Sequence, residues 1–143
     1  MRRTVLAVAG CCLGMFFFVW LAIAADQPRI TKAVLGTGVT DNYEIVNAAS
    51  EFPPDVPKIF CAWKAEDVPA DKSLRGVWIA EDVGKVAPPN YKIDEATVNV
   101  ARASAGSFSL SKPDNNFPVG KYRIEIYIGE ELAKTVPFAI KDK

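Results

Sequence analysis

The stretch that decides the fold is residues 117–140, which read FPVGKYRIEIYIGEELAKTVPFAI. Apolar side chains at positions 122, 124, 126 and 128 alternate with charged side chains at 123 and 125. Successive side chains of a strand point to opposite faces, so this period of two predicts a strand with one buried and one solvated face. Gly129 and Glu130 follow, and a Gly-X pair suits a two-residue type II′ hairpin because glycine accepts a positive φ at the first position.

The return strand is predicted over residues 131–140, with Val136, Phe138 and Ile140 on one side. Pro137 lies inside this strand and cannot donate a ladder hydrogen bond, which indicates an edge strand or a bulge. Edge strands expose unpaired backbone groups, which proteins either protect or use to add a partner strand. We therefore expect a contact surface on this edge, partly protected by Pro137 and by a lysine, and made by Glu131, Leu132, Lys134, Thr135 and Val136.

The start of the first of these two strands carries the pattern Pro118-x-Gly120-x-Tyr122. Proline and glycine turn the chain sharply, and the tyrosine opens the strand. Its hydroxyl can bond a nearby backbone group, as in the tyrosine corner of immunoglobulin-like folds. We interpret Pro118, Gly120 and Tyr122 as a structural motif and not as a ligand site.

The rest of the chain repeats short strand patterns separated by turn signals. Three prolines between positions 53 and 57 exclude a regular ladder there. Further strands are predicted at residues 58–64, 74–80 and 97–100 and around Phe108, and a first strand pair at 30–39 is expected to break at residues 36–38. Seven to eight short strands predict a single all-β domain, an antiparallel β-sandwich of the immunoglobulin-like type.

The N-terminus is typical of a targeting segment, which divides the chain into residues 1–25 and a β-sandwich domain at 26–143. Arg2 and Arg3 precede an apolar run at residues 5–23, and small residues at 22–24 suit a signal peptidase. The run is also long enough to remain as a membrane-anchoring helix. Residues 8–11 resemble a lipoprotein box ending at Cys11. Each of these readings places the domain outside the cytoplasm, in the periplasm or the extracellular space.

The composition excludes several classes of function. The chain has 17 basic and 17 acidic side chains, and removing Arg2 and Arg3 leaves 15 basic against 17 acidic. No basic cluster appears, which argues against nucleic acid and against a membrane footprint other than an uncleaved N-terminal segment. The absence of histidine removes the commonest general base and metal ligand. We predict no catalytic, metal-binding or cofactor-binding residue, although pairs of loop carboxylates leave calcium open.

Cys61 is the one cysteine after residue 25, and it shares strand parity with Ile59 and Trp63. A cysteine in this position is typical of a small buried apolar side chain. The alternative is an odd thiol that pairs between molecules or acts as a nucleophile. Because no histidine is present to activate the thiol, we favour the buried interpretation.

Over about residues 45–140 the chain resembles exported bacterial sandwich domains, immunoglobulin-like and mostly uncharacterised. In many of these sequences a tryptophan stands at the position of Phe117. The resemblance implies a fold and an accessory or interaction role, with no shared active site. It rests on Phe52-Pro53-Pro54, Ile59, Trp78, Phe108-x-Leu110, Phe117-Pro118-x-Gly120-x-Tyr122, Gly129 and Phe138-x-Ile140.

The sequence therefore predicts a non-enzymatic module that acts by contact with another envelope or extracellular protein. The alternative is a small-ligand or carbohydrate-binding module that uses aromatic side chains near residues 81–91 or 113–117. The exposure of Trp78, Tyr91 and Phe117 separates the two hypotheses. An exposed aromatic platform favours a sugar, whereas buried rings beside an open strand edge favour a protein. Trp63, like Trp78, lies in a predicted strand and is expected in the core.

Overall fold

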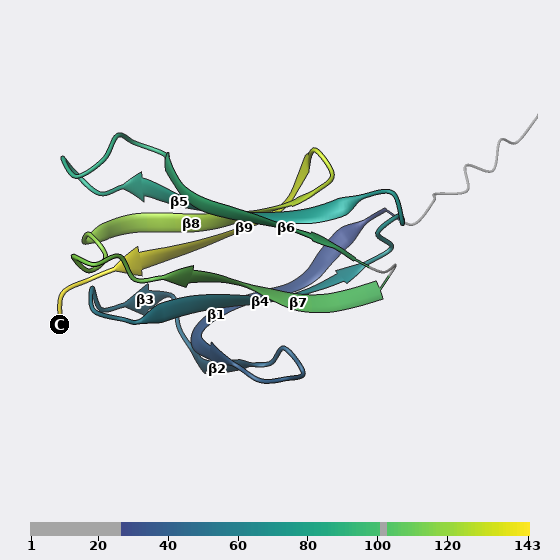
Figure 1. Cartoon of the computed structure of the whole chain (residues 1–143), viewed down its shortest axis with the longest axis horizontal. Coiled ribbons are helices and arrows are strands. Elements are labelled where there is room, and N and C mark those ends of the chain that lie inside the picture. The colour runs from purple at the N-terminus through teal and green to yellow at the C-terminus, as the bar shows by residue number, and fades with distance from the viewer. Residues whose placement is uncertain (1–26, 101–102) are drawn as a thin grey trace, which may run out of the picture.

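The computed structural model describes residues 27–100 and 103–143, which form two β-sheets packed face to face (Figure 1). One sheet has the order β2-β1-β4-β7 and the other the order β3-β9-β8-β5-β6. The strands are β1 (Arg29–Val39), β2 (Ile45–Ala48), β3 (Glu51–Phe52), β4 (Lys58–Glu66), β5 (Ser73–Asp82), β6 (Tyr91–Asn99), β7 (Ala103–Ser111), β8 (Gly120–Ile128) and β9 (Glu131–Ile140).

This part of the chain holds nine strands and no helix, so the all-β prediction is confirmed and the expected number of strands is exceeded by one. Consequently none of its elements is a helix long and apolar enough to cross a membrane. The predictions for residues 1–25, including Cys11 and the choice between signal peptide and anchor, lie outside the described residues. The domain boundary at residue 26 stays a prediction.

The core forms between the sheets from the strand faces that the sequence pattern indicates. Tyr122, Ile124, Ile126 and Ile128 of β8 are all buried. On β9, Phe138 and Ile140 are buried and Val136 packs against the core. At the hairpin between these strands, Gly129 has a φ of 61° and Ile128 pairs with Glu131, as expected for a two-residue turn that starts with glycine.

The expected break in the first strand is wrong. β1 runs without interruption through Gly36 and pairs with β2 on one side and β4 on the other. A Cβ atom at Gly36 would lie 2.3 Å from Ile45 Cγ2 and 2.6 Å from the Val46 carbonyl oxygen. The glycine therefore serves the close approach of β2 and does not end the strand, which is a tertiary requirement that the local pattern does not reveal.

Two other elements differ from the sequence prediction. β3 pairs with β9 in parallel, through Glu51 opposite Ala139 and Phe52 opposite Ile140, so the sandwich is not wholly antiparallel. β6 is nine residues long where a strand at 97–100 was expected. Its apolar alternation is weak because almost all of its side chains are exposed, so neither face gives the period-two signal of a half-buried strand.

Candidate functional site

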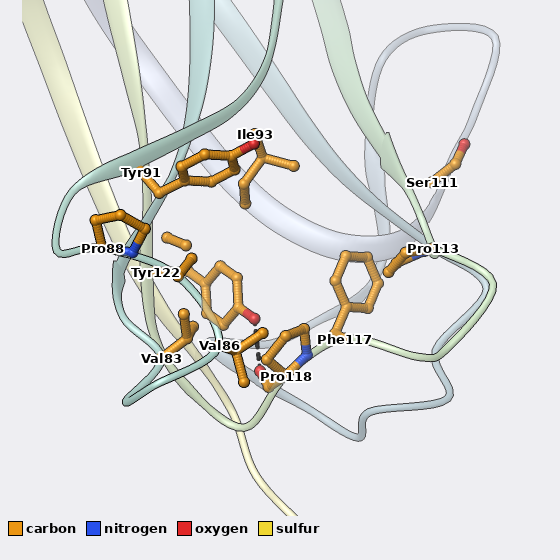
Figure 2. Close-up of a pocket in the computed structure, with 12 residues that line it drawn as sticks. Val83, Val86, Pro88, Tyr91, Ile93, Ser111, Pro113, Phe117, Pro118 and Tyr122 are labelled. Atoms are coloured by element: carbon orange, nitrogen blue, oxygen red, sulfur yellow. Dashed lines mark hydrogen bonds between the residues drawn. The ribbon is translucent and has the colours of Figure 1, made fainter.

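An apolar pocket of about 370 Å³ opens at one end of the sandwich. Residues 83–90 and the start of β6 form one side, and the end of β7 with residues 113–118 forms the other. Ala80 and Tyr122, on adjacent strands of the five-stranded sheet, also line it. Figure 2 shows the rings of Tyr91, Phe117 and Tyr122 around the open space. The two loops named in the ligand-binding hypothesis thus lie together at this end.

The tyrosine corner builds one wall of this pocket. The Tyr122 hydroxyl donates a hydrogen bond to the Pro118 carbonyl oxygen at 2.5 Å, drawn as a dashed line in Figure 2. The Tyr122 ring stacks on Phe138 at 5.3 Å between centroids and meets Phe117 edge-on at 6.5 Å. Burial raises the pKa of Tyr122 to about 12. The hydrogen bond is that of a tyrosine corner, and the assignment of Pro118, Gly120 and Tyr122 to a purely structural role stays a prediction because Pro118 and Tyr122 also line the pocket.

A close backbone approach at Gly120 explains why this corner requires glycine. Its φ is 157°, and a Cβ atom there would lie 2.2 Å from the Asp82 carbonyl oxygen. Because the obstacle is backbone, it cannot move aside like the end of a flexible side chain. Gly120 therefore lets the start of β8 approach the end of β5, which brings the two pocket-forming loops together.

Local hydrogen bonds hold the loop at residues 83–90. The Asn90 amide donates to the Glu81 carbonyl oxygen at 3.0 Å, and Arg123 donates from Nη1 to the Asn90 side-chain oxygen at 2.8 Å. Asp82 accepts a bond from the Gly84 amide at 3.1 Å. Asn90 and Gly84 both have positive φ, near 57° and 65°, as turn residues of these types tolerate.

The rim of the pocket exposes large apolar side chains. Val86 is 70% exposed, Tyr91 51%, Ile93 37% and Val119, next to the pocket-lining Pro118, 49%. Scattered apolar residues are normal on a protein surface, but a group of them around an apolar pocket marks an interaction site. What this end can do chemically is bind an apolar group and exclude water from it.

The remaining aromatic residues answer the question of exposure. Trp78 and Trp63 are each 2% exposed and belong to the core, as predicted. Phe117 is also buried, which leaves Tyr91 as the exposed ring of the three that were to separate sugar from protein. One exposed ring in a hollow is not a flat aromatic platform.

The sequence-predicted edge on β9 lies away from this pocket, toward the Gly129–Glu130 turn at the other end of β8. Glu131, Leu132, Lys134 and Thr135 are exposed, and Val136 is half-buried. β3 pairs only with Ala139 and Ile140, so in the described part of the chain no strand is hydrogen-bonded to the outer side of residues 131–138, although β1 lies close to β9. β9 is thus an edge strand over most of its length, and its use as a contact surface stays a prediction.

Pro137 fits this edge because of the direction of the backbone groups. The Ala139 amide donates to the Ser50 carbonyl oxygen at 2.9 Å, so residue 139 faces outward from β8. Strand alternation gives residues 137 and 135 the same direction, since the register with β8 is regular there. The missing N–H of Pro137 would point away from β8, so the proline costs no hydrogen bond between β8 and β9. The bulge of this strand lies at Ala133 and not at the proline.

The loop carboxylates serve ion pairs and turns. Arg29 pairs with Glu66 and Asp67, and Glu95 lies near Arg75 and Lys92. Among the described residues no three His, Cys, Asp or Glu side chains gather as a metal site would require.

Cys61 is fully buried beside Ile59 in the core, and burial raises the pKa of its thiol to about 12. The buried interpretation is confirmed. A thiol that is neutral and inaccessible at physiological pH is a poor nucleophile.

No protein-family model and no curated protein matches this chain. Among solved structures it is similar to an immunoglobulin-like protein from Pseudomonas aeruginosa, at 16% identity and a TM-score of 0.53, over 82% of this chain and 99% of that one. A beta-D-glucoside glucohydrolase from Trichoderma reesei aligns at 10% identity and a TM-score of 0.45, over 80% of this chain and 19% of that one. The first similarity confirms the immunoglobulin-like fold.

Proposed function

We propose that this domain is a non-enzymatic binding module of the cell envelope that acts by contact with another protein. The observation that carries the proposal is the apolar pocket with its exposed rim of Val86, Tyr91, Ile93 and Val119. An exposed apolar group of this kind is stabilised when a partner covers it and removes it from water. The location outside the cytoplasm rests on the sequence pattern of residues 1–25.

The side-chain polar groups of the pocket favour binding over catalysis. The Tyr122 hydroxyl is already bonded to Pro118, and Figure 2 shows the Ser111 hydroxyl pointing away from the open space, which leaves the hydroxyl of Tyr91 among the lining side chains. A serine nucleophile needs an adjacent base, and the chain contains no histidine. The lining side chains thus provide apolar contact and, at most, hydrogen bonds that orient a bound group.

Site-specific photo-cross-linking in intact cells tests this function. A photoreactive phenylalanine analogue at Tyr91 is expected to give a protein adduct of defined mass, because Tyr91 lies on the rim. The matched control carries the same analogue at Asp41, an exposed residue of the turn between β1 and β2. An adduct that forms at both positions, or at neither, contradicts the proposal.

The volume of the pocket favours a small apolar ligand as the second candidate. About 370 Å³ lies within the range of small-molecule sites, and aromatic rings line this pocket. The fluorescent probe 1-anilinonaphthalene-8-sulfonate measures this possibility. If a small ligand is the natural occupant, an apolar extract of the cell envelope should displace the probe from the wild type. A Tyr91→Ser variant should bind the probe at least tenfold more weakly.

A further inference from the structure

β7 is the outer strand of the four-stranded sheet, and its free edge has a defined set of unpaired backbone groups. The strand pairs with β4 from Ala103 to Ser111 without a register shift. The Lys112 amide continues this ladder and donates to the Pro57 carbonyl oxygen at 2.9 Å. Because N–H and C=O groups alternate in direction along a strand, the even-numbered residues bond to β4 and the odd-numbered ones face outward.

The outward backbone groups nearest the pocket are those of Ser107, Ser109 and Ser111. No strand lies beside this edge in the described part of the chain, where β7 is the end of its sheet. Ser109 and Ser111 are exposed. The edge therefore offers amide donors and carbonyl acceptors at every second residue, about 6.6 Å apart.

This edge lacks the features by which proteins prevent unwanted strand pairing. β7 reads ASAGSFSLS, with no charge and no proline, and it has no bulge against β4. The other edges are each protected. β2 and β3 are only four and two residues long, and the part of β1 before Gly36 carries charges and a bulge. β9 has Lys134 and Pro137, and β6 has Lys92, Asp94 and Glu95. Among the edges that the structure describes, that of β7 is the one most open to an added strand.

The pocket adjoins the same edge. Ser111 lines it from β7, while Tyr91 and Ile93 line it from β6 in the facing sheet. On the other side of β7, Phe108 and Leu110 are buried in the core. A strand added beside β7 would continue this inner row, and its nearest inward side chain would meet the pocket. The exposure of Tyr91, Asp94 and Ala96 shows that the four-stranded sheet leaves β6 uncovered, so there is room for that strand.

We propose that the β7 edge and the apolar pocket form one groove, which binds an extended segment of a partner protein with an apolar side chain at every second position. One of these side chains fills the pocket beside Tyr91 and Ile93, and the backbone pairs with Ser109. This inference rests on the proposed function and adds the form of the partner. A second copy of β7 fits poorly, because its apolar side chains Phe108 and Leu110 are already in its own core.

A random decapeptide library displayed on phage and selected on the whole domain tests the groove. Enriched peptides should carry apolar residues at alternate positions. The key variant is Ser109→Pro, which removes an outward N–H without touching the ladder to β4. The matched control is Thr135→Pro, which removes an outward N–H from the β9 edge in the same way. Ser109→Pro should weaken binding of the enriched peptides at least tenfold, and Thr135→Pro by less than twofold.

Amide hydrogen exchange, measured on the wild type with and without bound peptide, tests the groove even if a proline variant fails to fold. Bound peptide should slow exchange at Ser109 and Ser111 at least tenfold and leave Thr135 unchanged. The groove is overturned if no peptide is enriched, if enriched peptides bind Ser109→Pro normally, or if Thr135→Pro is the variant that loses them. The last result would instead place strand pairing on β9. A specific cross-link at Tyr91 together with any of these results would leave the proposed function standing and remove only the groove.

Discussion

The edges of β7 and β9 both expose unpaired backbone N–H and C=O groups, but only β9 carries features that hinder the addition of a partner strand. On β9, the open edge carries Lys134, Pro137 and a bulge, and β3 pairs with the last two residues of the strand. β7 has small uncharged side chains on its outward positions and an apolar pocket at one end. Since both edges expose N–H and C=O groups, the difference lies in what prevents a partner from using them. Where a partner strand can bind therefore depends on how an edge is protected, and not only on whether a strand lies at the edge of its sheet.

Amide exchange should show the largest effect, because it separates bonded from free groups along a single strand. Phe108 and Leu110 donate toward β4, whereas Ser109 between them faces outward. For a domain of ordinary stability, the two bonded amides should exchange at least about a thousandfold more slowly than that of Ser109. Exchange measured by NMR at neutral pH checks this. Comparable protection at all three residues would mean that the outer edge of β7 is already covered.

The second prediction concerns how firmly each edge is anchored. Phe108 is buried and tilted against Trp63 at 5.9 Å between centroids, whereas Leu132 is 52% exposed. Phe108→Ala should reduce the free energy of unfolding by about 3–5 kcal/mol. Leu132→Ala should change it by about 0.5 kcal/mol or less. Urea denaturation measures both, and a large loss at Leu132 would show that β9 is held against a surface not seen here.

The third prediction tests the corner that shapes the pocket beside β7. Tyr122→Phe removes the hydrogen bond to Pro118 and should reduce the free energy of unfolding by about 1 kcal/mol. The folded pKa of Tyr122 is raised from 10.0 to about 12, so above pH 10 the unfolded chain loses this proton first. The contribution of Tyr122 is complete below pH 10 and is lost as the pH rises to 12.

Denaturation curves at pH 8, 10 and 11.5 should therefore show a steeper alkaline loss for the wild type than for Tyr122→Phe. Burial also raises the pKa of Cys61, so both proteins keep some alkaline sensitivity. Identical slopes for the two proteins would contradict the buried phenol.

The smallest effect on stability is expected when a protecting lysine is added to the β7 edge or removed from the β9 edge. Ser109→Lys and Lys134→Ser each replace an exposed side chain and should shift the free energy of unfolding by no more than about 0.5 kcal/mol. Their effects on association should differ, because a charge on β7 blocks pairing while β9 still keeps Pro137. Isothermal titration with the peptides enriched on the domain should show weaker binding to Ser109→Lys and unchanged binding to Lys134→Ser. A larger loss of binding in Lys134→Ser would contradict the difference between the two edges.

The sequence predicts those features that depend on local patterns. Alternation identified β8 and β9, Gly129 identified their turn, and Pro118-x-Gly120-x-Tyr122 identified the tyrosine corner. The continuity of β1 through Gly36 and the parallel pairing of Phe52 with Ile140 depend on contacts between distant segments, so no local pattern signals them. The same holds for the pocket: the two loops were recognised as candidates, but their meeting depends on the close approach at Gly120.

The β7 edge was missed because its signal is an absence. Serines alternating with Phe108 and Leu110 predict a strand, but only the sheet order shows that this strand is an outer one. Pro137 indicates an edge strand, but the same proline discourages a partner strand from pairing there. A chain of small uncharged residues on one side of a strand pattern is the signal that could have indicated the open edge.

Cys61 on β4 has a consequence for the redox chemistry of the domain. Antibody domains join their sheets by a disulfide whose second cysteine lies two residues after the corner tyrosine. That position is Ile124 here, and both Ile124 and Cys61 are fully buried. Apolar contact thus takes the place of the cross-link, and the folded domain needs no oxidant to form and no protection from reductants. Its core thiol becomes accessible only when the sheets separate, so a thiol reagent that is present during unfolding would label Cys61 and mark the molecules that had opened.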